Sequence, residues 1–215
     1  MASTFLKKKH NRADLMERSR QFLDQWALFL RQFVKHPGMI GSVIPSSPML
    51  VDNLLDGVDW DRTRLFVEFG PGVGTFTRPI LERLHPDATL LAIDLNADFV
   101  AYLESRIADP RLRVVHGSAV DVTRHVRESG HEQADYVVSG IPFSTLPDGV
   151  GDAVCAATQS VLKPGGAFLV YQYSAYVRSL LMPRFARIDE RIEWLNIPPC
   201  RTFRAVSGEM PAGRA

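Results

Sequence analysis

The residues with the most informative spacing are three alternate glycines in the segment Gly70–Gly74, which Glu68 precedes by two positions. An apolar run, Leu65–Val67, leads into the glycines, and Phe76–Leu84 has the pattern of a helix. A strand, a tight turn and a helix are therefore expected here. Because glycine has no Cβ, the backbone of such a turn can adopt positive φ and a ligand can lie directly on it. The pattern predicts a binding site for a flat or polar ligand.

A second acidic residue follows the next expected strand. Leu90–Ile93 is an apolar run that ends in Asp94, 24 residues after Gly70. An acidic side chain at this place accepts hydrogen bonds from a ribose diol, which nicotinamide dinucleotides and S-adenosylmethionine both carry. Glu68 would repel a diphosphate but attract a methionine ammonium group, and Leu162–Gly166 is a Pro-Gly-Gly turn before a later strand. These two features favour S-adenosylmethionine.

Together these segments resemble the class I S-adenosylmethionine-dependent methyltransferases. The resemblance implies an α/β fold with a seven-stranded, mostly parallel, Rossmann-like sheet and helices on both faces. It also implies that the cofactor leaves as S-adenosylhomocysteine. The candidate cofactor-binding residues are Ser46, Ser47, Glu68, Gly70, Gly72, Gly74, Asp94, Leu95, Ser118, Ala119 and Ser139.

Composition limits the alternatives. The chain has 215 residues, 46% hydrophobic and 23% charged, which suits one soluble domain with a substantial core. Its net charge of +1 argues against a polyanion binder. Cys155 and Cys200 lack metal-ligand spacing, so we expect reduced thiols in the cytoplasm and no metal. No apolar run approaches the ~20 residues that span a bilayer, and no secretory signal is present.

The first 36 residues differ from the rest in charge, with eight Lys or Arg against three Asp or Glu. Apolar residues recur at helical spacing between Leu15 and Val34, which predicts a basic amphipathic helix. The apolar face of this helix could pack on the domain core. Its Phe and Trp content and the lysines at 7–9 favour an anionic membrane interface instead, bound through residues 7–35. Each buried large apolar side chain would contribute roughly 1.5–3 kcal/mol and each basic residue about 1 kcal/mol.

His36–Gly38 ends this helix, so we divide the chain into the helix at 1–36, a methyltransferase domain at 37–207 and a disordered tail at 208–215. Ser47 is an expected N-cap with Pro48 in the first turn of a helix that continues to Leu55. Ser46 and Ser47 could alternatively contact the methionine carboxylate of the cofactor.

The third expected strand, Leu112–His116, leads to Ser118 and Ala119. Many related enzymes carry an acidic residue here that binds the adenine amino group, and this chain has Ser118 instead. The adenine contact is therefore assigned to Ser118 and the backbone of Ala119, with Asp121 as an alternative.

The fourth expected strand, residues 134–138, ends at a loop where the acceptor meets the methyl group in this fold. Enzymes that methylate exocyclic base amines carry Asn or Asp two residues before a Pro-aromatic pair. Here Gly140 takes that place, before Pro142 and Phe143. Glycine cannot orient a planar amine through a side chain. Phe143 could bound a pocket, and backbone carbonyls near Gly140 could accept from an alkyl ammonium.

A helix is expected at 149–162 and a fifth strand at 167–173, whose end carries a tyrosine cluster. Alternating tyrosines on a strand commonly pack. Near a methyl-transfer site they could line a cationic pocket, so Tyr173 and Tyr176 are candidate acceptor residues. A helix over 174–184 would expose Arg178 and Arg184 to a phosphate, and a hairpin around a Pro-Pro turn would complete the sheet.

Four segments narrow the resemblance: Ile40–Ser47, Glu68–Gly74, Ser139–Pro142 and Asn196–Pro199. They look like the bacterial phospholipid N-methyltransferases, whose core is similar to that of rRNA adenine dimethylases. The family methylates the headgroup amine of phosphatidylethanolamine towards phosphatidylcholine, and close relatives methylate ornithine lipids. Its members bind membranes peripherally through an N-terminal amphipathic helix.

The resemblance implies a monomeric enzyme on the cytoplasmic face of the inner membrane, with a phospholipid headgroup as substrate and no nucleic-acid partner. A neutral amine would attack the sulfonium methyl, and orientation and desolvation would supply the catalysis. Tyr173, Tyr176 or a water relayed to a carboxylate could take the amine's proton, or solvent could. An rRNA adenine N6-dimethyltransferase and a small-molecule methyltransferase are the alternative functions, and a non-enzymatic cofactor-binding or scaffold protein is a third.

Overall fold

The computed structural model describes residues 47–194, 196 and 199–208. They belong to the larger of two compact units into which the chain divides, residues 44–215. The predicted helix at 1–36 lies outside the described residues, as do Ser46 and the tail from residue 209 onward. Within the described part, no helix is long and apolar enough to cross a membrane.

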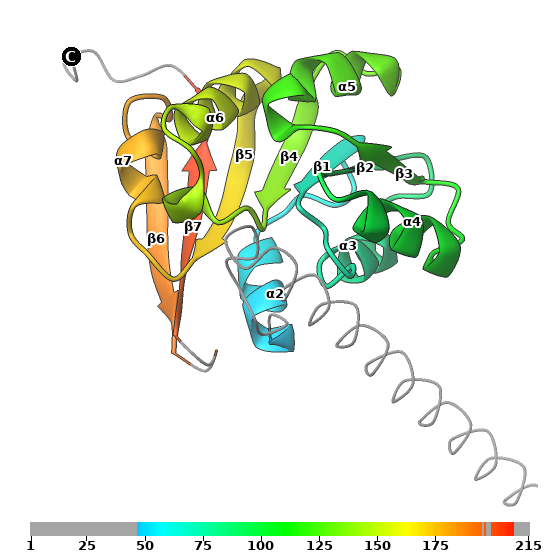
Figure 1. Ribbon diagram of the computed structural model, residues 1–215, viewed down its shortest axis with the longest axis horizontal. Coiled ribbons are helices and arrows are strands. Elements are labelled where there is room, and N and C mark those ends of the chain that lie inside the picture. Colours follow the sequence, from blue (N-terminus) through cyan, green and yellow to red (C-terminus); the bar gives the residue numbers. More distant parts are fainter. Residues whose placement is uncertain (1–46, 195, 197–198, 209–215) are drawn as a thin grey trace, which may run out of the picture. The chain divides into compact units, whose positions relative to one another are not determined.

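One seven-stranded sheet organises this unit, with the strand order β3-β2-β1-β4-β5-β7-β6 (Figure 1). All neighbouring strands run parallel except β7, which is antiparallel to β5 and β6. The predicted Rossmann-like sheet with its C-terminal hairpin is confirmed. The strands are Leu65–Phe69 (β1), Thr89–Asp94 (β2), Leu112–His116 (β3), Ala134–Ser139 (β4), Leu162–Gln172 (β5), Arg187–Glu193 (β6) and Cys200–Val206 (β7).

Helices cover both faces of the sheet, and each face has its own apolar core (Figure 1). One core includes side chains of α5, α6 and α7, and the other includes side chains of α2 and α3. Every residue of β1 is buried, as expected for a central parallel strand. The helices are Pro48–Leu55 (α2), Thr77–Arg83 (α3), Ala97–Arg106 (α4), Val122–Glu128 (α5), Val150–Val161 (α6) and Val177–Leu181 (α7).

Two element boundaries differ from the sequence-based expectation. The strand predicted at 167–173 begins at Leu162, which pairs with Ala134 of β4. The Gly165 amide also donates to the Ser207 carbonyl, and the Ser207 amide donates to the Gly166 carbonyl. The predicted turn is thereby paired with the chain after β7. The helix predicted at 174–184 covers only Val177–Leu181, and α5 was not predicted at all.

The strand order places a topological switch point between β1 and β4, which are adjacent in the sheet but lead to connections that diverge. Open α/β sheets bind ligands in the crevice outside the carboxyl ends of the strands at such a point. Phe69 pairs with Ser139 at the end of this ladder, so the residues that follow, Gly70 and Gly140, lie side by side. The Gly140 amide donates to the Phe69 carbonyl over 2.9 Å. The fold therefore brings the two loops singled out in the sequence to one place.

Candidate active site

The turn after β1 needs its glycines for two different reasons. Gly70, Gly72 and Gly74 have φ of +63°, +55° and +86°, where other residues are strained. A Cβ on Gly74 would lie 3.0 Å from Leu103 Cδ2 of α4, so this glycine allows close packing. A Cβ on Gly72 would meet no atom of the described residues within 4 Å. Among these residues the space over Gly72 is therefore open to a ligand, as the predicted cofactor site requires.

Asp94 connects this turn to the end of β2. Its Oδ2 accepts from the Gly72 amide over 3.2 Å, and its Oδ1 accepts from the Asn96 amide over 2.8 Å. Burial raises the pKa of the Asp94 carboxyl, and these two hydrogen bonds oppose that rise. A carboxylate has about four acceptor sites, so Asp94 retains acceptor capacity for a ribose diol. Asp94 lies at the end of β2 as predicted, and its contact with a ribose stays a prediction.

Glu68 lies beneath the turn rather than on its open side. Its side chain is 2% exposed, and its Oε2 accepts from the Thr77 hydroxyl over 2.7 Å. Burial raises the pKa of Glu68 to about 8, and the negative charge of Asp94 adds to this effect. Glu68 thus joins the end of β1 to the first turn of α3. Its predicted attraction for a methionine ammonium stays a prediction, and the sequence carried no sign of its Thr77 partner.

Two further predicted cofactor-binding residues, Leu95 and Ser118, follow the neighbouring strands. Leu95 is 64% exposed directly after β2, and the ring of His116 lies 3.0 Å from its carbonyl. Ser118 caps a short 3-10 helix, Ala119–Asp121, by accepting from the Val120 amide. The Gly117 amide donates to the Asp94 carbonyl, so this loop is held next to the end of β2. The predicted adenine contact of Ser118 and Ala119 stays a prediction.

The acceptor loop after β4 is closely packed at Gly140. A Cβ on this residue would lie 2.6 Å from the Tyr171 hydroxyl oxygen and 3.0 Å from the Gly70 carbonyl oxygen. The position therefore lacks both the amide side chain of base-modifying enzymes and the room for one. Ser139, predicted to touch the cofactor, is fully buried and accepts from the Ile141 amide over 3.2 Å. Its hydroxyl shapes the loop.

Phe143 corrects one expectation. Its ring is 2% exposed and packs edge-on against Phe168 in the core, so it does not bound an acceptor pocket. The loop is instead held by Gln172, whose Nε2 donates to the Ile141 carbonyl over 2.6 Å. The Pro142 carbonyl accepts from the Thr145 amide and hydroxyl. No short sequence pattern indicated these hydrogen bonds.

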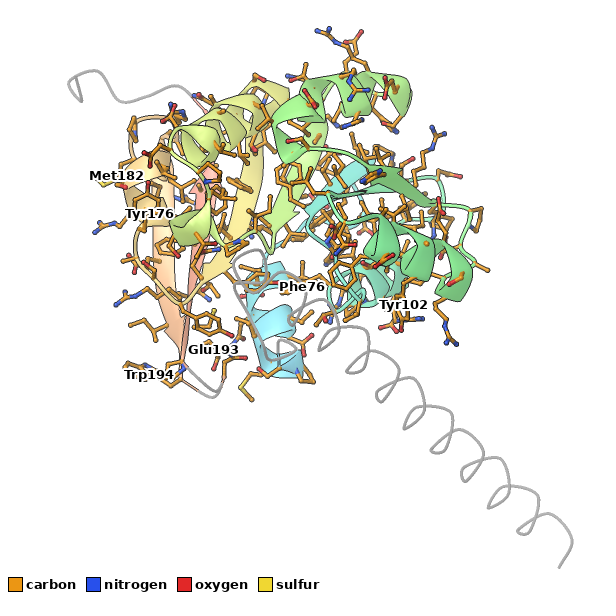
Figure 2. All side chains as sticks on the ribbon, in the orientation of Figure 1. Phe76, Tyr102, Tyr176, Met182, Glu193 and Trp194 are labelled. Atoms are coloured by element: carbon orange, nitrogen blue, oxygen red, sulfur yellow. The ribbon has the colours of Figure 1, made fainter. Side chains whose placement is uncertain are left out.

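The tyrosines after β5 separate into two groups. Tyr171 reaches Gly140, although the sequence analysis did not select it, whereas Tyr173 and Tyr176 are 37% and 52% exposed. Figure 2 labels Tyr176 near α7 and β6. Of the two arginines expected to be exposed, Arg178 is 58% exposed and lies 3.7 Å from Glu190. Arg184 is largely buried and lies 2.8 Å from Asp152, so that expectation is wrong.

The segment before β1 is attached to the C-terminal hairpin. Ser47 caps α2 as predicted, because its Oγ accepts from the Leu50 amide over 3.1 Å. Its own amide donates to Asn196 Oδ1 over 3.2 Å, and Asn196 is 2% exposed. Asn53 of α2 also donates to Glu193 at the end of β6. Capping therefore occupies one lone pair of Ser47, while its predicted carboxylate contact stays a prediction.

Among the described residues, no group of three or more His, Cys, Asp or Glu side chains could hold a metal ion. Both cysteines are buried, and burial raises the pKa of Cys155 to about 12 and of Cys200 to about 11, so neither is a nucleophile.

Comparison with known proteins agrees with this geometry. A family model described as a methyltransferase domain matches residues 66–166. An ornithine lipid N-methyltransferase of Singulisphaera acidiphila is 33% identical over 82% of this chain and 93% of that protein. A ribosomal RNA small subunit methyltransferase A of Paraburkholderia xenovorans is 36% identical over 61 residues, which are 28% of this chain and 22% of that protein.

Solved structures share the fold at low identity. TrmN from Thermus thermophilus aligns with a TM-score of 0.59 and 19% identity over 74% of this chain and 48% of that one. The T. thermophilus 16S rRNA N2 G1207 methyltransferase, solved with S-adenosylmethionine and guanosine, aligns with a TM-score of 0.56 and 21% identity over 78% and 44%. With the relative that matches over nearly its full length, these findings establish that the chain belongs to the class I methyltransferases and uses S-adenosylmethionine as its methyl donor.

Proposed function

We propose that this enzyme methylates the amine of a membrane lipid headgroup, either phosphatidylethanolamine on the way to phosphatidylcholine or an ornithine lipid. The observation that carries the proposal is the 33% identity to an ornithine lipid N-methyltransferase over 93% of that relative. A match of that length includes the acceptor side of the fold as well as the cofactor side. Both lipids present a primary alkyl amine next to charged groups, so one pocket chemistry serves either.

The acceptor loop supports an alkyl amine over a nucleobase. A base amine is planar and is held by an amide side chain and an aromatic platform, whereas here Gly140 has no side chain and Phe143 lies in the core. An alkyl amine is tetrahedral and needs only hydrogen-bond acceptors and an apolar wall. The short match to the ribosomal RNA methyltransferase covers 28% of this chain, so it gives little support for an RNA substrate.

The reaction requires a neutral amine with its lone pair directed at the methyl group. The bound cofactor supplies an electrophilic methyl on a sulfonium. The protein supplies orientation and a site that excludes water, which together can account for much of the barrier reduction. A tyrosine of ordinary pKa near 10 is a poor base at neutral pH, so the amine loses its proton to solvent before transfer.

Membrane attachment is the second part of the proposal. The basic amphipathic segment predicted at 1–36 would dock reversibly on anionic lipid, at the cytoplasmic face of the inner membrane. There it would bring the strand ends close to the headgroups. This arrangement explains how an enzyme without a membrane-spanning helix in its described part could reach a lipid amine.

Labelled S-adenosylmethionine tests the acceptor. The full chain is incubated with phosphatidylglycerol vesicles that contain phosphatidylethanolamine, an ornithine lipid or phosphatidylcholine, and separately with ribosomal RNA or free phosphoethanolamine. Label is expected in the chloroform phase with one of the two amino lipids, and none with phosphatidylcholine vesicles. Label in RNA or in the aqueous phase, with none in lipid, would show that the acceptor class is wrong.

Vesicle flotation tests the attachment. The full chain should float with anionic vesicles and less with neutral ones, and a chain lacking residues 1–36 should stay at the bottom of the gradient. Equal flotation of both chains would refute the role of this segment. Soluble phosphoethanolamine serves as an activity control. If the shortened chain labels it, the catalytic unit is active without residues 1–36.

A further inference from the structure

The hydroxyl of Tyr171 occupies the volume that a side chain on residue 140 would need, 2.6 Å from the position of its Cβ. We propose that this hydroxyl holds the acceptor amine for methyl transfer, in place of the amide side chain that Gly140 lacks. The inference rests on the proposed function, since it requires an amine acceptor. The sequence placed Tyr171 only in a tyrosine cluster that could line a cationic pocket, and the structure gives its hydroxyl a specific position beside Gly140.

The sheet register fixes Tyr171 at this point. Ser139 of β4 pairs with Val170 of β5, so Gly140 and Tyr171 are the next residues along the two strands. The ring of Tyr171 stacks on Phe76 with 4.9 Å between centroids and 26° between planes. Phe76 is 3% exposed and directly precedes α3 (Figure 2). Tyr171 is thus fixed between the acceptor loop and the cofactor turn.

Two oxygen atoms border the same small space. The Gly70 carbonyl oxygen lies 3.0 Å from the position where a Cβ on Gly140 would be, and the Tyr171 hydroxyl oxygen lies 2.6 Å from it. Gly70 begins the turn over which the cofactor lies, and the space is at the β1–β4 switch point. Both oxygens can accept an N–H, and the acceptor amine is placed against them, beside Gly140 and outside the filled volume of its absent side chain.

The chemistry of a phenol suits this role. A neutral tyrosine hydroxyl can accept a hydrogen bond while it donates another, and it stays protonated at neutral pH. Accepting an N–H from the amine turns the amine's lone pair towards the methyl group. The nitrogen then forms the new C–N bond, the electron pair of the S–C bond stays on sulfur, and the proton left on nitrogen goes to water.

This role depends on the number of N–H groups that the acceptor has left. A neutral primary or secondary amine has at least one N–H to donate, whereas a neutral tertiary amine has none. Removing the Tyr171 hydroxyl should therefore slow the first and second methylations more than the third. A residue that only packs would affect all three steps alike.

The test compares Tyr171→Phe with wild type on vesicles of phosphatidylethanolamine and of its monomethyl and dimethyl derivatives, or on ornithine lipids of matching methylation state. We expect S-adenosylmethionine affinity within twofold of wild type, initial rates on the first two acceptors lower by about 10- to 100-fold, and the rate on the dimethyl lipid within threefold. Tyr102→Phe in α4 is the matched control, expected to be unchanged. Figure 2 labels Tyr102 on a different part of the domain from Phe76.

Wild-type rates on all three lipids, or an equal loss on all three, would overturn the role of the hydroxyl. If wild type itself labels no amino lipid, the proposed function fails, and the role of Tyr171 fails with it. Failure of the Tyr171 role alone is therefore distinguishable, because wild-type labelling of lipid remains.

A second pair of variants separates contact from space filling. Gly140→Ala places a methyl group 2.6 Å from the Tyr171 hydroxyl oxygen, so the hydroxyl must move and the first methylation should slow. Adding Tyr171→Phe removes that close contact. If Gly140→Ala slows the reaction only because its methyl group clashes with the hydroxyl, the double variant would recover wild-type rates. We expect the double variant to stay as slow as Tyr171→Phe. Thermal melts by circular dichroism establish that each variant is folded.

Discussion

Replacing Glu68 with glutamine should make the cofactor-free enzyme less sensitive to alkaline pH. Glu68 is 2% exposed, with Thr77 as its hydrogen-bond partner, and burial raises its pKa from 4.5 to about 8. Glutamine has nearly the same shape and keeps an oxygen that accepts from the Thr77 hydroxyl, but it never carries a charge. The substitution therefore isolates the charge of the carboxyl.

The sign follows from proton binding. Between pH 4.5 and 8 the folded state keeps the Glu68 proton that the unfolded state releases, so stability falls as pH rises through this window and stays low above it. At 1.36 kcal/mol for each pKa unit, the complete loss is about 5 kcal/mol. From pH 5 to pH 8 it is on the order of 3 kcal/mol. That corresponds to roughly 6 to 12 °C in Tm for a domain of this size.

Urea unfolding at pH 5, 6, 7 and 8 measures the effect. Other titrating groups cancel in the difference between Glu68→Gln and wild type, so this difference should move in favour of the variant by about 3 kcal/mol between pH 5 and pH 8. A difference that is constant across this range would refute the reasoning, because it would mean that Glu68 has the same pKa in the folded and unfolded states.

Three other predictions concern the turn and the far end of the sheet. Asp94→Ala should lower S-adenosylmethionine affinity at least tenfold by calorimetry, since the ribose loses its acceptor and the Gly72 amide its partner; affinity within threefold of wild type would place the ribose elsewhere. Gly72→Ala should cost about 1–2 kcal/mol of stability, because its φ is positive, and should also weaken cofactor binding. Gly74→Ala should lower Tm more, because its new Cβ would lie only 3.0 Å from a Leu103 methyl group. A larger loss of Tm for Gly72→Ala than for Gly74→Ala would contradict the packing. Asp135→Ala removes the acceptor of two backbone amides at the start of β1, so we expect about 1–3 kcal/mol of destabilisation. The KM for the cofactor should not change, and a raised KM would contradict a purely structural role of Asp135.

Local signals accounted for most of the fold. Ser47 and Pro48 start α2 as predicted, because capping and a fixed proline φ act within one turn of the chain. Largely buried parallel strands carry apolar runs, so β1, β2 and β4 were recognisable. The edge strand β3 has no fully buried residue and was recognised from its central valines, Val114 and Val115. The beginning of β5 was not recognisable, since Gly165 has a turn-like φ of +79° and the segment joins the sheet through Leu162 pairing with Ala134 and through the hydrogen bonds of Gly165 and Gly166 with Ser207.

The candidate site likewise has residues that the sequence could indicate and contacts that it could not. The cofactor could be predicted because its candidate residues follow two consecutive strands at a recognisable spacing: Gly70, Gly72 and Asp94. The contact between Gly140 and Tyr171 depends on the register of β4 against β5, for which no short segment carries information. The inward direction of Phe143 likewise depends on how the loop after β4 folds back on the core.

The hydrogen bond from Ser47 to Asn196 has a consequence for synthesis. The two residues are 149 positions apart, and α2 also packs against β5 and β7. At about 5 to 20 residues per second, the ribosome needs roughly 7 to 30 seconds to make the chain between them. During that time the contacts of α2 with Asn196 and β7 cannot form, so the segment that precedes α2 leaves the ribosome before the sheet is complete. On the membrane attachment proposed above, this segment would be available to the bilayer before the catalytic unit has finished folding.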